Sequence, residues 1–132
     1  MNKNKFDEFI RVLIPETTED LENIYIESIY INDKNVVRAS KGNKSETIEY
    51  RKIGLDYFDQ KEVMVKASLL KLYGKNYDWG GLIGVRPTKI VRRFLDMGLE
   101  YDEIENILET IYLVSKKKID LLIRIVKTEM SY

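Results

Sequence analysis

Cysteine and histidine are both absent from the 132 residues of this chain. Without cysteine, no disulfide can form and no thiolate can act as a nucleophile or hold an iron–sulfur cluster. The absence of histidine as well removes the usual zinc and haem ligands, and it excludes a Ser-His-Asp arrangement or a histidine general base. Sites built from cysteine or histidine are therefore excluded.

Long apolar runs and a net charge are also missing. No run approaches the length of a transmembrane helix, and the start MNKNKFDEF lacks the apolar core of a signal peptide. The 22 basic and 22 acidic residues cancel, so nothing attracts the whole chain to nucleic acid or anionic lipid. We therefore expect a cytoplasmic protein with no membrane partner, and nucleic acid is disfavoured as a partner.

What is present is the composition of a globular domain, with 44% hydrophobic and 33% charged residues. The length suits one domain or two small lobes that share a core. The order of the expected elements predicts an α+β fold. It consists of an N-terminal helix, a three-stranded antiparallel meander and a helix in a lobe of residues 1–75, followed by a three-helix lobe of residues 76–132.

In the front half, apolar residues at helical spacing predict a helix over residues 5–14, which Pro15 ends because a residue before proline avoids the α region. Three stretches rich in β-branched and aromatic residues then alternate with turn residues, which predicts a meander with one solvated face. The predicted strands cover residues 23–31, 35–40 and 45–53. A helix follows from an N-cap at Asp56 to about Tyr73, and Gly74 closes it.

In the back half, three helices follow one another with short links. Pro87 suits the first turn of one helix, and Gly98 lies where a helix end is expected. Asp102 has the spacing of a capping residue for the next helix, and Ser115 can cap the last. Three lysines, at 116–118, then fall in a first turn where the helix dipole disfavours cations.

The stretch from Trp79 to Gly98, WGGLIGVRPTKIVRRFLDMG, holds the candidate site. Its glycines permit a shaped loop, and the basic helix start after it could bind an anion. GGLIG is neither GxGxxG nor a P-loop, so a nucleotide site is not supported. The alternative that we favour is structural, with the glycines allowing close packing and the arginines contacting a neighbouring domain. The candidate residues are Trp79, Gly80, Gly84, Arg86, Pro87, Lys89, Arg92 and Arg93.

The region from about residue 75 to 129 resembles a known family. Trp79-Gly80, the GVRPTK core at 84–89 and YLVS at 112–115 carry the resemblance. The segment is similar to the region before the catalytic domain of HemZ-type oxygen-independent coproporphyrinogen III oxidases (coproporphyrinogen dehydrogenases), members of the radical S-adenosylmethionine superfamily. The front half agrees with the layout of that family but carries little motif information.

The resemblance implies an N-terminal accessory or docking domain, inactive by itself, of a longer protein. That parent would oxidatively decarboxylate coproporphyrinogen III to protoporphyrinogen IX with a [4Fe-4S] cluster and S-adenosylmethionine. The CxxxCxxC cluster motif of the family has no counterpart here, so no cofactor is expected in this chain. The implied partners are its own C-terminal radical S-adenosylmethionine domain and, as a weaker expectation, coproporphyrinogen III. The alternative is a small nucleic-acid-binding or protein-interaction module that uses the basic helix 86–93.

Overall fold

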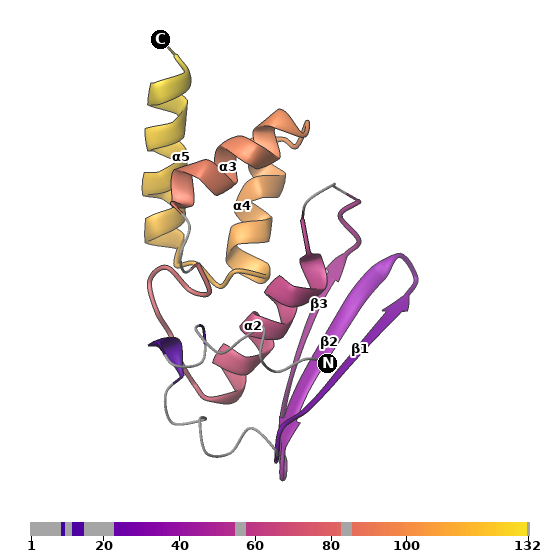
Figure 1. The fold of residues 1–132 in the computed structure, drawn as a ribbon. Helices are drawn as coiled ribbons and strands as arrows, with labels where there is room; N and C mark the ends of the chain where they lie inside the picture. The colour runs from indigo at the N-terminus through magenta and orange to yellow at the C-terminus, as the bar shows by residue number, and fades with distance from the viewer. Residues whose placement is uncertain (1–8, 10–11, 15–22, 55–57, 83–85, 132) are drawn as a thin grey trace. The chain divides into compact units, whose positions relative to one another are not determined.

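A computed structural model describes the chain except for residues 1–8, 10–11, 15–22, 55–57, 83–85 and 132 (Figure 1). The described residues form a three-stranded antiparallel sheet and four bounded helices, the α+β fold that the sequence predicts. The strands are β1 (Tyr25–Ile31), β2 (Lys34–Lys41) and β3 (Lys44–Arg51). The helices are α2 (Gln60–Leu72), α3 (Pro87–Asp96), α4 (Tyr101–Thr110) and α5 (Lys116–Met130). Two compact units divide the chain, Met1–Asn76 and Tyr77–Tyr132.

In the first unit, two tight turns set the strand order β1-β2-β3. Asn32 and Asp33 both have positive φ, 53° and 62°, which is the type I′ hairpin geometry that Asn and Asp tolerate better than other side chains. Gly42, with φ 59°, opens the second two-residue turn. The predicted meander is therefore confirmed, with two-residue turns between its strands.

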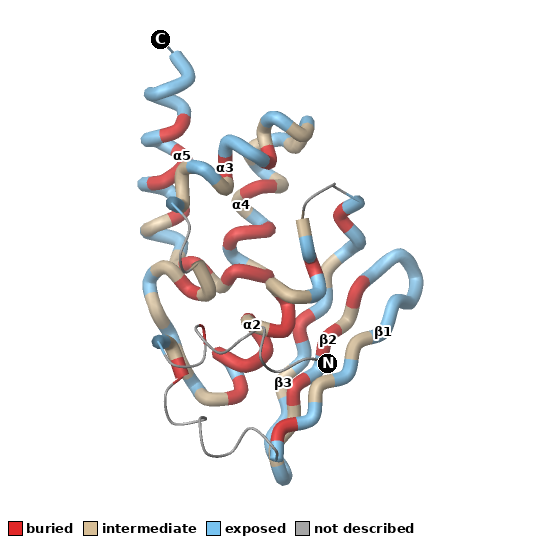
Figure 2. Tube along the Cα trace, viewed as in Figure 1, coloured by how far each residue is buried: buried red, intermediate tan, exposed pale blue. Residues whose placement is uncertain are grey.

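One face of the sheet packs on α2 and the other is exposed, as the alternation predicts. In the central row of the sheet, Val37 pairs with Ser28 of β1 on one side and with Ile48 of β3 on the other. Val37, Ile48 and the neighbouring Ala39 are buried, and α2 contacts β2 and β3. Figure 2 shows this alternation along β2, whereas no residue of the edge strand β1 is fully buried.

The predicted start of α2 is wrong. The N-cap is Asp59, whose carboxylate accepts the Glu62 N–H at 3.1 Å, whereas the predicted cap, Asp56, lies outside the described residues. The buried Gln60 side chain accepts the Ile53 N–H at 2.8 Å and donates to the Arg51 carbonyl at 2.9 Å. This pair of bonds ties the end of β3 to the first turn of α2.

The end of α2 confirms the prediction for Gly74. This glycine has φ 65°; its N–H bonds to the Lys71 carbonyl, and the Lys75 N–H bonds to Leu70, which together form a Schellman motif. The helical spacing of Met64, Ala67, Leu70 and Tyr73 predicts a buried stripe; the first three are buried and Tyr73 is half-buried. The fully or nearly fully buried residues of α2 are Gln60, Met64, Val65, Ala67, Ser68, Leu69, Leu70 and Leu72.

The sequence predicts that the lysines of α2 are solvated, but Lys66 is partly buried. Its ammonium group lies 3.6 Å from the Glu62 carboxylate and 5.6 Å from the centre of the Phe9 ring. Of the helix predicted over 5–14, the described residues Phe9, Val12 and Leu13 are helical, whereas Ile14 is buried but not helical. Residues 5–8, 10 and 11 and Pro15 lie outside the described residues.

In the second unit, α3, α4 and α5 contact one another. Their shared core comes from apolar residues that recur at helical spacing in each helix. Its buried residues are Val91, Phe94, Ile104, Ile107, Leu108, Ile119, Leu122, Ile123 and Val126. No helix among the described segments is both long and apolar enough to cross a bilayer.

The ends of these three helices test the capping predictions. Gly98, with φ 93°, and Leu99 close α3 in a second Schellman motif, as predicted. Ser115 caps α5 by accepting the Lys118 N–H at 3.4 Å, also as predicted. Asp102 is not the cap of α4: the N-cap is Glu100, which makes no side-chain capping bond, so Asp102 lies inside the first turn.

Candidate functional site

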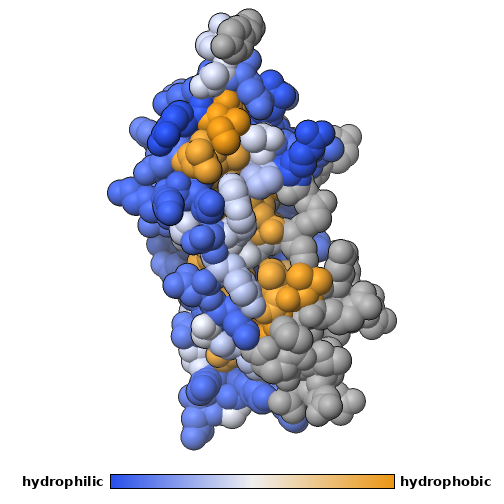
Figure 3. All heavy atoms as spheres, turned by 90° about the vertical axis from the view of Figure 1, so that its left-hand side faces the viewer, coloured by the Kyte–Doolittle hydropathy of each residue, from blue (hydrophilic) through white to orange (hydrophobic). Residues whose placement is uncertain are grey.

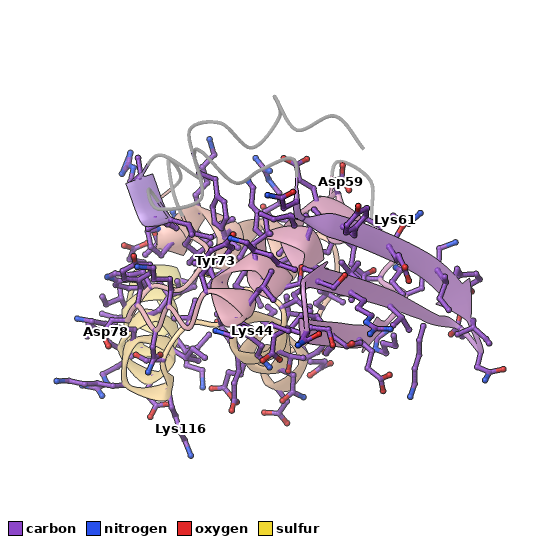
Figure 4. The ribbon with its side chains drawn as sticks, turned by 90° about the horizontal axis from the view of Figure 1, so that it is seen from below. Lys44, Asp59, Lys61, Tyr73, Asp78 and Lys116 are labelled. Carbon is purple, nitrogen blue, oxygen red and sulfur yellow. The ribbon has the colours of Figure 1, made fainter. Side chains whose placement is uncertain are left out.

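The turn of residues 77–82, here the Trp79 turn, is held against the α4–α5 connection. Gly81 donates its N–H to the Tyr112 carbonyl oxygen at 2.7 Å, and Ser115 donates its N–H to the Asp78 carbonyl at 2.8 Å. Figure 4 labels Asp78 of this turn and Lys116, the first residue of α5, and both lie beside that helix. The structure thus brings together two segments of the family resemblance that lie far apart in the sequence, Trp79-Gly80 and the YLVS stretch.

Gly80 is required by this contact. Its φ of 56° lies in the left-handed region, and a Cβ atom there would overlap the carbonyl oxygen of Tyr112 and the backbone of Leu113. Leu113 itself has φ 58°, an uncommon conformation for a branched side chain. The two chain segments therefore meet backbone against backbone, which confirms the expectation of a shaped loop at Gly80. Gly84 lies outside the described residues.

The indole ring of Trp79 explains one of the three lysines at the start of α5. The Lys118 ammonium group lies 5.6 Å from the centre of the Trp79 ring, a cation–π distance. Lys116 and Lys117 are exposed, and α5 has no acid in its first turn. The helix dipole therefore disfavours all three lysines, but only Lys118 gains an aromatic partner among the described residues.

The start of α3 has the form that the sequence predicts, with Pro87 in the first helical position and Arg86 as N-cap. The first turn contains no acid, and Arg86 makes no side-chain capping bond. Pro87 has no N–H to offer, and the Lys89 N–H bonds to the Arg86 carbonyl at 3.0 Å. Any attraction of an anion to this helix start therefore comes mainly from side-chain charge rather than from free backbone donors.

Four exposed cations form the basic face of α3: Arg86, Lys89, Arg92 and Arg93. They surround an open hollow of about 410 Å³, which Thr88 and Asp96 also line. Arg92 pairs with Glu129 of α5 at 3.6 Å, with both side chains about half exposed. Across the described part of the chain, no carboxylate lies within ion-pair distance of the other three cations.

Arg93 also interacts electrostatically with Tyr112, which is mostly buried. Burial raises the pKa of the Tyr112 hydroxyl above its ordinary value because the charged phenolate loses its hydration, and the positive charge of Arg93 partly opposes this rise. The α3 face thus has an electrostatic link to the connection that the Trp79 turn contacts.

The predicted site residues therefore fall into two groups. Trp79, Gly80 and Pro87 shape the local backbone and its contacts. Arg86, Lys89 and Arg93 are exposed without a carboxylate partner among the described residues, and Arg92 pairs with Glu129. Sequence reasoning missed Asp96, although its place three and four residues after Arg93 and Arg92 puts it on the same helix face. It also missed Glu129, which is distant in the sequence, so no local spacing linked it to α3.

An apolar row on α5 was also missed. Leu121 and Ile125, one helical turn apart, are 37% and 39% exposed. Glu129 continues the row by four residues, and its ion pair with Arg92 links the row to the basic face. In Figure 3, which faces the α5 side of Figure 1, apolar residues gather between charged ones over this helix. The signal in the sequence was the second i, i+4 apolar pair beside the core stripe.

The residues present do not fit an iron–sulfur cluster. The chain has no cysteine, and the described residues bring no three His, Cys, Asp or Glu side chains together. This chain therefore supplies no ligand set for the cluster that the resemblance implies. Comparison with protein families, characterised proteins and solved structures finds no match to this chain.

Proposed function

We propose that this chain is a non-catalytic docking domain that binds a carboxylate-bearing protein surface through the basic face of α3. The observation that carries this proposal is the exposure of Arg86, Lys89 and Arg93 without a carboxylate partner among the described residues. Arginine is suited to this role because its planar guanidinium binds a carboxylate through two parallel hydrogen bonds.

The apolar row on α5 supports a protein as the partner rather than a small anion. Protein interfaces combine an apolar centre with a charged rim, and arginine is enriched in them. Leu121 and Ile125 supply exposed apolar surface, and the Arg92–Glu129 pair joins it to the basic face. A free phosphate or carboxylate would not bury the apolar side chains of this row.

The family resemblance supplies the identity of the partner within this proposal. It is the C-terminal radical S-adenosylmethionine domain of a cytoplasmic oxygen-independent coproporphyrinogen III oxidase, of which this chain is the N-terminal domain. The [4Fe-4S] cluster and S-adenosylmethionine supply the radical chemistry of that enzyme. Since this chain has no cysteine, the cluster ligands belong to the other domain.

The test uses the full-length protein and the double variant Arg86→Glu/Lys89→Glu. Its matched control is Lys116→Glu/Lys117→Glu, which makes the same charge change at two exposed lysines of α5. Docking predicts that the α3 variant loses hydrogen-exchange protection on α3 and about tenfold in kcat for protoporphyrinogen formation, with the control unchanged. Unchanged exchange and turnover in both variants would contradict the proposal.

Two other outcomes are informative. A rise in KM alone, with α3 still protected, would assign the basic face to the propionates of coproporphyrinogen III instead of a protein surface. Binding of RNA or DNA by the 132-residue chain in an anisotropy titration, lost steeply as salt rises, would favour the nucleic-acid module. The zero net charge of the chain argues against that second outcome.

A further inference from the structure

The edge strand β1 leaves a large apolar area uncovered. Its exposed apolar side chains are Tyr25 (68%), Ile29 (54%), Tyr30 (54%) and Ile31 (52%). In the described part of the chain β1 pairs only with β2, so its other edge is open. Open edges with apolar side chains are templates for pairing with another strand.

The two edges of this sheet differ in how they are protected. The far edge, β3, carries charges at four of its eight residues: Lys44, Glu46, Glu49 and Arg51. In contrast, β1 has one charge in seven residues, Glu27, and contains no lysine or proline. Charged residues and prolines are the usual devices against strand pairing. The β1 edge is therefore much less protected against pairing than the β3 edge.

The hairpin geometry fixes which backbone groups face the open edge. In a two-residue type I′ hairpin, the residues that flank the turn, here Ile31 and Lys34, exchange both of their hydrogen bonds. Because the direction of bonding alternates along a strand, every second residue from Ile31 bonds to β2. The N–H and C=O groups of the other residues, Ile26, Ser28 and Tyr30, point to the open edge.

These three residues are placed symmetrically about Ser28. We propose that two copies of this chain pair their β1 strands antiparallel about a two-fold axis at Ser28, which makes one continuous six-stranded sheet. In this register Ser28 lies opposite Ser28 of the second copy, and Ile26 lies opposite Tyr30. Each of these pairs has its hydrogen-bonding groups facing each other, so both bonds of each pair can form.

The side chains fit the same register. Tyr25 lies opposite Ile31 of the second copy, an aromatic–β-branched pair of the kind that stabilises sheets. Glu27 lies opposite Ile29, so no two like charges are directly opposed. All four exposed apolar side chains of β1 thereby gain an apolar partner, either directly across or on the diagonal. A shift by one residue would turn the bonding groups of one strand away from those of the other.

The absence of cysteine makes the register directly measurable. In Ser28→Cys, the two thiols would lie on directly opposite residues with Cα atoms about 5.5 Å apart, within the range of a disulfide. In Glu27→Cys, the opposite residue is Ile29, so the thiols are displaced by roughly 7 Å along the strands, which is too far. Thr47→Cys on β3 is the control for random collision.

The experiment has two parts on the 132-residue chain. Mild oxidation should cross-link Ser28→Cys into a dimer and leave Glu27→Cys and Thr47→Cys largely monomeric. Analytical ultracentrifugation over a concentration series should show a reversible dimer whose dissociation constant rises roughly tenfold or more in Ser28→Pro, which removes the outward N–H from each copy. Thr47→Pro, at an outward position on β3, should leave that constant unchanged.

The proposal is overturned if the chain stays monomeric throughout, or if all three cysteine variants cross-link equally. It is also overturned if a dimer forms that Ser28→Pro does not weaken, since the contact would then lie elsewhere, for instance on the apolar row of α5. Circular dichroism of Ser28→Pro, compared with Thr47→Pro, shows whether the hairpin is intact. The Ser28→Cys result does not depend on that variant.

Discussion

The backbone N–H of Gly81 donates a 2.7 Å hydrogen bond to the carbonyl oxygen of Tyr112. This bond, together with the return bond from Ser115 to Asp78, anchors the Trp79 turn on the connection between α4 and α5. Gly80 therefore has a structural explanation that needs no ligand. The basic face of α3, which follows in the sequence, is a separate feature, because its cations are exposed and take no part in this contact.

Gly80→Ala is expected to lower the free energy of unfolding by about 2–4 kcal/mol, because left-handed strain adds to overlap with the Tyr112 carbonyl. Urea denaturation followed by circular dichroism measures it. The control is Gly98→Ala, where φ is 93° but nothing lies within 4 Å of the added Cβ. If both variants lose equal stability, backbone strain alone accounts for the effect and the close contact contributes nothing.

Gln60→Leu is expected to destabilise the chain by about 2–3 kcal/mol, because the Ile53 N–H and the Arg51 carbonyl both lose their partner. Gln60 is 5% exposed, so water cannot readily replace the amide. Lys61→Leu, at the next and exposed position (Figure 4), should change stability by less than about 0.5 kcal/mol. Similar losses of stability in the two variants would show that the two Gln60 hydrogen bonds between β3 and α2 make no particular contribution.

Tyr112 should make stability fall at alkaline pH. Its folded pKa is raised, so the folded state holds the proton more tightly, and the resulting stabilisation is present below the ordinary tyrosine pKa near 10 and lost as pH rises towards the folded pKa. Tyr112→Phe should therefore flatten the decline in unfolding free energy between pH 9 and about 12. The exposed Tyr25→Phe is the control. Parallel curves for all three proteins would argue against this role.

The three lysines at the start of α5 should respond differently to charge reversal. Lys116→Glu is expected to raise stability by about 0.5–1 kcal/mol, because a carboxylate suits the helix N-terminus. Lys118→Glu should gain less or lose stability, since it also removes the ammonium group over Trp79. Thermal melts at low and high salt measure both changes. Equal gains would mean that the contact with Trp79 has no net value.

Local sequence signals were sufficient where a residue acts on its immediate neighbours. Gly74, Gly98, Pro87 and Ser115 end or begin helices as predicted, because capping depends on a few consecutive backbone groups. The same reasoning failed at Asp102. Helix α4 already begins at Tyr101, so Asp102 lies inside its first turn and cannot be the N-cap. It also misplaced the start of α2, where the side-chain bonds of Gln60 reach back to β3.

The sequence by itself determined the α+β class, the meander and the apolar faces of the helices, because periodicity reports which side of an element is buried. It also excluded thiolate and imidazole chemistry, since those side chains are absent. Only the tertiary structure decided that Gly80 meets Tyr112, that Glu129 pairs with Arg92 and that, among the described strands, β1 has an unpaired apolar edge. The first two features join residues that are distant in the chain, and the third depends on which strand lies at the edge of the sheet. The periodicity of apolar residues within one element carries no information about either.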